Sequence, residues 1–128
     1  MKVTAGKLFE ATEVLRRALR DRRDDRVHLP TLAAFRIALL IRQLEPEYLV
    51  LQESRIELLK RLGKEVEKQP GFWAVLPENN EEFQKQWSLI TEEELEVHCK
   101  PILLATLGDG MSYFSVQELL LLGDFVKE

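Results

Sequence analysis

An apolar stripe runs along the chain from Ala34 to Leu62, in steps that alternate between three and four residues. This spacing is typical of a helix that packs lengthwise against another helix. Arg55 is the one charged member, and Pro46 lies within the run without shifting its phase. The pattern therefore predicts a long helix that needs a helical partner. The stripe consists of Ala34, Ile37, Ile41, Leu44, Tyr48, Leu51, Arg55, Leu58 and Leu62.

Pro46 leaves two interpretations of this segment. A proline inside a helix lacks the amide hydrogen and clashes with the carbonyl four residues back, at a cost of about 3 kcal/mol. The segment could therefore form two helices, 30–44 and 46–62. Because the stripe keeps its phase across the proline, we favour one kinked helix over residues 30–62 that stops at Gly63.

Residues 4–22 predict the helical partner. Thr4 is a suitable N-terminal cap, and apolar side chains then recur on one helical face. Residues 20–26 contain no apolar residue, so the helix should end there and pass into an exposed loop. We expect helix 4–22 to pack antiparallel on helix 30–62, which gives a helical hairpin over residues 1–64. The apolar face consists of Leu8, Ala11, Leu15, Ala18 and Leu19.

The second half of the chain predicts two short strands. Residues 72–76 form an apolar, aromatic run that Pro77 ends, and residues 95–103 begin with alternating apolar and polar positions. We expect these segments to form a small two-stranded sheet that covers one end of the hairpin. The length of the connection permits a parallel or an antiparallel pair.

Two shorter helices are also predicted in this half. Asn79 and Glu82 have the spacing of a capping box, which would open a helix over residues 80–91. Ser115 opens a second capping box, and its helix should run to about Phe125. The expected fold class is α+β, mostly α. We expect one domain of residues 1–128, in which a small α/β tail (65–128) packs on the hairpin.

Size and composition agree with a single globular domain. A chain of 128 residues with 45% hydrophobic residues can bury a core without a metal or disulfide. Cys99 is the only cysteine, so no intrachain disulfide can form. No apolar run approaches the roughly 20 residues that span a bilayer, and the N-terminal segment lacks the pattern of a secretory signal. We therefore expect a soluble, intracellular protein.

The net charge of −4 is unevenly distributed. Residues 1–64 hold 14 Lys and Arg against 9 Asp and Glu, whereas residues 65–128 hold 4 against 13. Such asymmetry can steer a charged partner or orient one subunit against another. Alternatively, the two halves neutralise each other within one fold.

Candidate catalytic and metal-binding residues are few. His98 and Cys99 are adjacent on a predicted strand, so their side chains point to opposite faces, and His28 lies far away in sequence. The acidic run of residues 92–96 is typical of a solvated turn, and Asp109 lacks the pattern of a P-loop or an EF-hand. We expect no enzyme activity, no metal site and no cofactor.

The remaining candidates indicate protein–protein contacts. Arginines are frequent in residues 16–26, but interspersed aspartates would repel a phosphate backbone, so nucleic-acid binding is not favoured. Arg55 could fix the register of a helix pair, or its guanidinium could reach water. In a chain this small Phe72 and Trp73 are expected to lie mostly in the core, whereas an exposed Phe72-Trp73 edge would form an interaction hot spot. The candidate protein-interaction residues are Arg55, Phe72, Trp73, Arg16 and Arg20.

The order of these features resembles a family of small, uncharacterised tailed-bacteriophage proteins, which have a long helical hairpin followed by a compact α/β tail. The resemblance spans most of the chain. The segments that carry it are Lys7-Leu8 with Ala11, Leu29-Pro30, residues 52–64, residues 77–83, Leu95-Glu96-Val97 and residues 119–126.

This resemblance implies a phage accessory or virion-associated protein without known enzymatic activity, in the host cytoplasm or the virion. It transfers no functional residues. The chain departs from the family at Pro46 and at Leu62-Gly63, where only the glycine of the family's turn is kept. We expect a non-catalytic structural or assembly protein with a protein partner or self-association, and no nucleic acid or membrane. The alternative is a small regulator that binds a host protein such as RNA polymerase or a nuclease.

Overall fold

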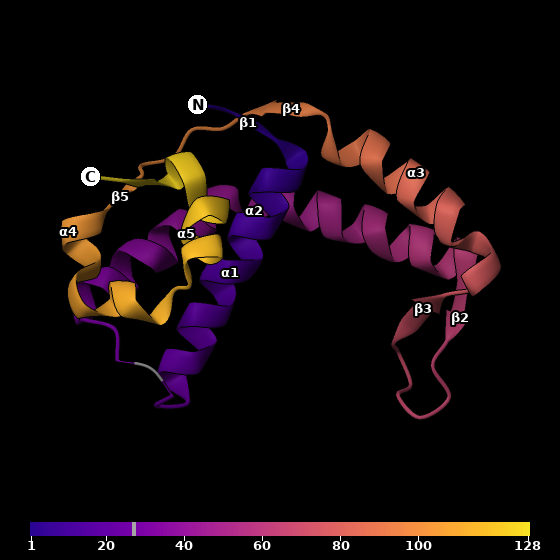
Figure 1. The fold of residues 1–128 in the computed structure, drawn as a ribbon, viewed down its shortest axis with the longest axis horizontal. Helices are drawn as coiled ribbons and strands as arrows, with labels where there is room; N and C mark the ends of the chain where they lie inside the picture. Colours follow the sequence, from indigo (N-terminus) through magenta and orange to yellow (C-terminus); the bar gives the residue numbers. More distant parts are fainter. Residues whose placement is uncertain (27) are drawn as a thin grey trace.

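The long helix α2 (Thr31–Leu62) runs through most of the length of the molecule (Figure 1). The computed structural model describes residues 1–26 and 28–128. The helix begins directly after Pro30, and it continues through Pro46 without interruption. The prediction of one helix is therefore confirmed, and the alternative of two helices is wrong.

Helix α1 (Ala5–Arg23) packs antiparallel against α2. Near the start of α1, Phe9 stacks on Tyr48 of α2, whereas Arg23 at its end lines a cleft with Ala34. The side chain of Thr4 accepts a hydrogen bond from the Lys7 amide at 3.3 Å, as the sequence predicts for a cap. In Figure 1, α1 crosses α2 obliquely, so it covers mainly the N-terminal part of the longer helix.

The predicted stripe of α2, here called the inner stripe, faces the core. Six of its members are buried, and Ile41, Arg55 and Leu62 are half-buried. On α1, the predicted face is equally well covered, with Leu8, Ala11 and Ala18 fully buried. Beyond the reach of α1, the helix α3 (Asn80–Thr91) covers α2. The hairpin and its orientation follow from these two apolar faces, which leave water together where the helices pack.

In the part of the chain that the structure describes, the strands form three separate two-stranded sheets, not the single sheet that the sequence predicts. The expected pairing of residues 72–76 with 95–103 is wrong. Instead, β2 (Gly63–Glu65) pairs antiparallel with β3 (Trp73–Val75), directly after α2. A nearby partner costs less loop-closure entropy than a distant one, which favours this local hairpin.

The segment 95–103 contributes to two different sheets. Strand β4 (Glu94–Glu96) pairs antiparallel with β1 (Lys2–Thr4), a strand that the sequence analysis did not predict. Strand β5 (Ile102–Leu103) pairs in parallel with β6 (Val126–Lys127). Residues 97–101, which include Pro101, separate the two strands. Through these two sheets, the segment 94–103 pairs with residues near the N-terminus and near the C-terminus of the chain.

The C-terminal region consists of short elements packed against α1 and the start of α2 (Figure 1). The capping box of Ser115 and Glu118 is confirmed, but the α-helix that it opens is shorter than predicted and ends in a 3-10 turn. The predicted box of Asn79 is wrong, because its side-chain amide donates instead to the Leu62 carbonyl at 2.9 Å. The elements are α4 (Leu104–Leu107), α5 (Val116–Leu122) and 3-10 turns at Pro77–Asn79, Gly108–Tyr113 and Gly123–Phe125.

The chain is thus α+β and mostly α, as predicted. One core cluster contains residues from both halves, including Val3, Leu8, Ile37, Ile102 and Phe125. Within the described residues, no helix combines the length and the apolar character needed to cross a membrane.

Candidate protein-interaction surfaces

The five candidate interaction residues lie on three different parts of the molecule. Arg16 and Arg20 line a groove between α1 and α2, which has a volume of about 760 Å³. Arg55 lines a second groove, with Trp87 of α3. Phe72 and Trp73 belong to the β2–β3 hairpin. The candidates therefore do not form a single site.

Tyr48 forms the base of the first groove and is 2% exposed. Its hydroxyl donates to Glu13 Oε1 at 2.8 Å, and its ring stacks on Phe9 with the centroids 5.2 Å apart. The Arg16 guanidinium carbon lies 5.0 Å from the centroid of the Tyr48 ring. Arg16 thus has an intramolecular partner, a cation–π contact that stabilises the α1–α2 hairpin.

The surroundings of Tyr48 also favour its neutral form. Burial of the ring, followed by the hydrogen bond to Glu13 and the charge of this carboxylate, raises the pKa of Tyr48 to about 12.

This raised pKa predicts a loss of stability in alkali. In the unfolded chain the phenol ionises near pH 10, whereas the folded protein keeps it neutral. The stabilising contribution is therefore complete below pH 10 and is lost as the pH rises towards 12. In urea titrations at pH 9 to 12, Tyr48→Phe should lose less stability with pH than the native chain. An equal loss in both proteins would contradict the role of Tyr48.

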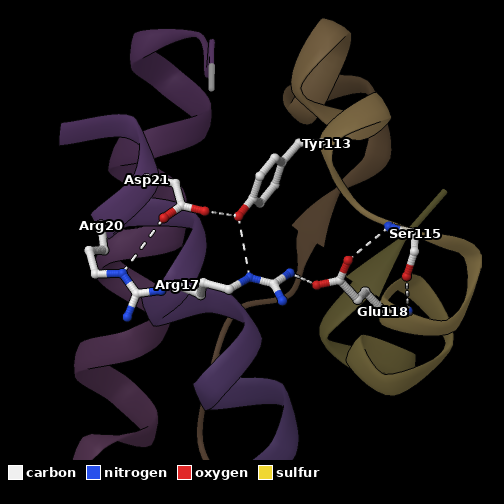
Figure 2. A network of polar contacts seen from close by, with 6 residues as sticks. All are labelled: Arg17, Arg20, Asp21, Tyr113, Ser115 and Glu118. Carbon is white, nitrogen blue, oxygen red and sulfur yellow. Dashed lines mark hydrogen bonds and ion pairs between the residues drawn. The ribbon is translucent and has the colours of Figure 1, made fainter. Parts of the chain in front are cut away.

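A polar network joins the end of α1 to the C-terminal region (Figure 2). Tyr113 donates a hydrogen bond of 2.5 Å to Asp21 Oδ2 and accepts one of 3.3 Å from Arg17 Nε. The Arg17 guanidinium also pairs with Glu118, which in turn accepts a hydrogen bond from the Ser115 amide at 3.0 Å. Arg17 is thus bound on two sides by the acidic second half of the chain. This pairing supports the interpretation that the two halves neutralise each other within one fold.

The same network involves Arg20. Its Nε lies 3.6 Å from Asp21 Oδ1 (Figure 2). The hydrogen bond from Tyr113, more than the neighbouring arginines, lowers the pKa of the Asp21 carboxyl group. Burial and the hydrogen bond to Asp21 raise the pKa of Tyr113. The carboxylate stays charged and the phenol stays neutral at physiological pH, so this network holds α5 against α1 and offers no acid–base pair.

Arg55 lies on the inner stripe beside α3. Its guanidinium carbon is 6.0 Å from the centroid of the Phe83 ring, and its side chain is half-buried. This contact places the charge against an aromatic face at the rim of the second groove.

The β2–β3 hairpin presents Phe72 to solvent. The side chain of Phe72 is 64% exposed, although its own backbone is fixed by hydrogen bonds with Val66 at 2.8 Å and Gln69 at 3.1 Å. Next to it, Trp73 is half-buried and has the Lys60 ammonium 6.0 Å from its ring centroid. The tight turn uses Gly71 at φ +89°, a conformation that suits glycine. The hairpin therefore holds an aromatic side chain in water on a hydrogen-bonded backbone.

A second surface was not recognised from the sequence. The outer stripe of α2 follows the same steps of three and four residues as the inner stripe, two residues earlier in the chain. Its apolar members include Phe35, Leu39 and Leu49, all exposed. The periodic spacing of these apolar residues was present in the sequence, but the inner stripe on the same helix has more apolar members. The outer stripe consists of Leu32, Phe35, Leu39, Arg42, Pro46, Leu49, Glu53 and Ile56.

The possible metal ligands are dispersed. His98 is exposed, and burial raises the pKa of the neighbouring Cys99 thiol, which keeps it protonated. In residues 1–26 and 28–128, no three His, Cys, Asp or Glu side chains lie close enough together to hold a metal ion.

The chain is thus a mostly helical α+β protein with an exposed aromatic hairpin and an exposed apolar helix face. No protein-family model, curated protein or solved structure matches it.

Proposed function

We propose that the chain is a non-catalytic structural or assembly protein that acts through protein–protein contacts. The observation that carries this proposal is the exposed Phe72 on the β2–β3 hairpin, which projects from the body at the end of α2 (Figure 1). An accessory protein of a tailed bacteriophage, located in the virion or the host cytoplasm, would use such a surface to join a larger assembly.

The physical argument concerns the hydrophobic surface of Phe72. A side chain that is 64% exposed contributes little to the stability of the fold, yet it keeps a large apolar area in contact with water. A partner pocket that removes this area from water gains free energy. Hydrogen bonds constrain the backbone of the turn, which reduces the conformational entropy lost on binding. Large aromatic side chains that a partner can bury in a pocket are typical centres of protein interfaces.

The charged residues around the turn complete this surface. Lys64, Glu65, Glu67 and Lys68 are all exposed and carry both signs of charge. An apolar centre within a polar rim is the usual composition of a specific interface. The mixed signs favour a protein partner over a phosphate backbone.

The hairpin variant Phe72→Ala should lose this interaction. We expect retention of the partner to fall by about 30-fold, the equivalent of the roughly 2 kcal/mol typical of a hot spot. The measurement is co-purification of the full chain from infected cells, with the partner identified by mass spectrometry. Val116→Ala is the matched control, because Val116 is 76% exposed on α5.

The identity of the partner tests the biological role. Recovery of a virion component supports the assembly role, and recovery of a host enzyme such as RNA polymerase favours the regulator instead. Undiminished binding by Phe72→Ala would exclude the hairpin as the contact surface. Failure to recover any virion or host protein would count against both roles.

A further inference from the structure

The outer stripe of α2 has the spacing of a coiled-coil seam. It runs from Leu32 to Ile56 over about 36 Å, and each of its eight side chains is exposed. Leu32 and Phe35 are 56% and 55% exposed. Two residues turn an α-helix by about 200°, so the outer stripe lies nearly opposite the inner stripe. Among residues 1–26 and 28–128, other elements cover the inner face, whereas the side chains of the outer stripe stay exposed.

The polar members of the outer stripe indicate which partner it fits. Arg42 and Glu53 are the only charged residues in the stripe, and they carry opposite charges. They lie equally far from the point between Glu47 and Tyr48, near the middle of α2. A second α2 laid antiparallel about this point therefore places Arg42 of each copy opposite Glu53 of the other.

The apolar members match in the same arrangement. Leu39 of one copy faces Ile56 of the second copy, and Pro46 faces Leu49. Four apolar side chains from each copy then leave water together, while both charges are paired within the seam; they are Leu39, Pro46, Leu49 and Ile56. The outer stripe is therefore self-complementary, and a second copy of the same chain is sufficient as its partner.

Residues that flank the stripe add a second pair of opposite charges. Arg36 and Glu57 lie on the same edge of the stripe, at similar distances from the point between Glu47 and Tyr48. In the antiparallel arrangement they approach each other across the interface. A parallel pair would instead bring Arg42 next to Arg42 and Glu53 next to Glu53, and such like-charge contacts oppose association.

We propose that the outer stripe of α2 is a symmetric dimer interface, with a second copy of this chain as its partner in antiparallel register. This interface lies on the side of the helix rather than on the β2–β3 hairpin. It therefore does not rest on the proposed function of Phe72, and the hairpin stays free to bind another protein.

The test is a charge swap within the full-length chain. Arg42→Glu and Glu53→Arg should each raise the dimer dissociation constant by at least about tenfold, because each places like charges together twice in the symmetric dimer. The double variant R42E/E53R restores opposite charges and should bring the constant back to within about threefold of the native value. Light scattering after size exclusion measures the dimer fraction across a concentration series.

The control is Lys85→Glu, a charge reversal at an exposed position of α3 away from the stripe, which should leave the dimer unchanged. Circular dichroism checks that each variant is folded. A native chain that stays monomeric at about 100 µM would overturn the proposal, as would a dimer that tolerates both single reversals. A dimer that both reversals weaken and the double variant fails to restore would overturn the antiparallel register.

Discussion

Replacing Tyr48 by alanine is expected to lower the free energy of unfolding by about 3–5 kcal/mol. The Tyr48 side chain is 2% exposed, and its ring stacks on Phe9 within the α1–α2 contact. The substitution removes this contact, leaves a cavity, and takes away the partners of Glu13 and Arg16. Urea denaturation followed by circular dichroism measures the loss. It is a large share of the 5–15 kcal/mol that stabilises a typical domain.

Tyr48→Phe separates packing from hydrogen bonding at this position. It keeps the ring and removes only the hydroxyl that donates to Glu13, so we expect a loss of about 1 kcal/mol. If both substitutions cost the same, the ring does not contribute the stabilisation inferred from its burial.

Replacing Gly63 by alanine is expected to cost about 1–3 kcal/mol and to open the β2–β3 hairpin. An added Cβ atom would lie 2.1 Å from the Ala74 carbonyl oxygen and 2.7 Å from that of Leu59. Both are backbone atoms, so the clash cannot be relieved by a change of rotamer. The φ angle of Gly63 is −132°, a backbone conformation that any residue can adopt. Glycine is therefore required here only because there is no room for a Cβ atom.

Limited proteolysis in the turn measures this effect. Cleavage within residues 66–72 should be at least about tenfold faster in Gly63→Ala, because an open hairpin exposes its backbone to the protease. Lys64→Ala is the matched control, since Lys64 is an exposed residue of the same strand. Native cleavage rates and stability in Gly63→Ala would show that the two strands tolerate the added methyl group.

The helical part of the fold was predictable because its signals are local. The inner stripe repeats along a single helix, and the caps at Thr4 and Ser115 depend on residues three positions away. The pairing of strands was not predictable in the same way. Strand β4 could pair with any extended segment, and β1 is only three residues long and offers almost no pattern of its own. Asn79 failed as a cap because the Leu62 carbonyl, far away in sequence, accepts its amide.

The interaction surfaces were predictable only in part. The sequence predicted a hot spot if Phe72 and Trp73 formed an exposed edge; Phe72 is exposed, whereas Trp73 is half-buried. Arg16 and Arg20 stood out as a basic cluster, but their contacts with Tyr48 and Asp21 depend on the folded arrangement. The outer stripe was overlooked because periodicity identifies an apolar face without showing which of two faces the fold will cover.

The pairing of β1 with β4 has a consequence for synthesis of the protein. Val3 and the buried face of α1 are covered in part by residues beyond position 93. A nascent chain that ends just after α2 therefore exposes this apolar surface to water. At about 5–20 residues per second, the ribosome needs several seconds to supply the missing segments. Helices α1 and α2 therefore keep part of their apolar surface in contact with water until nearly the whole polypeptide has been synthesised.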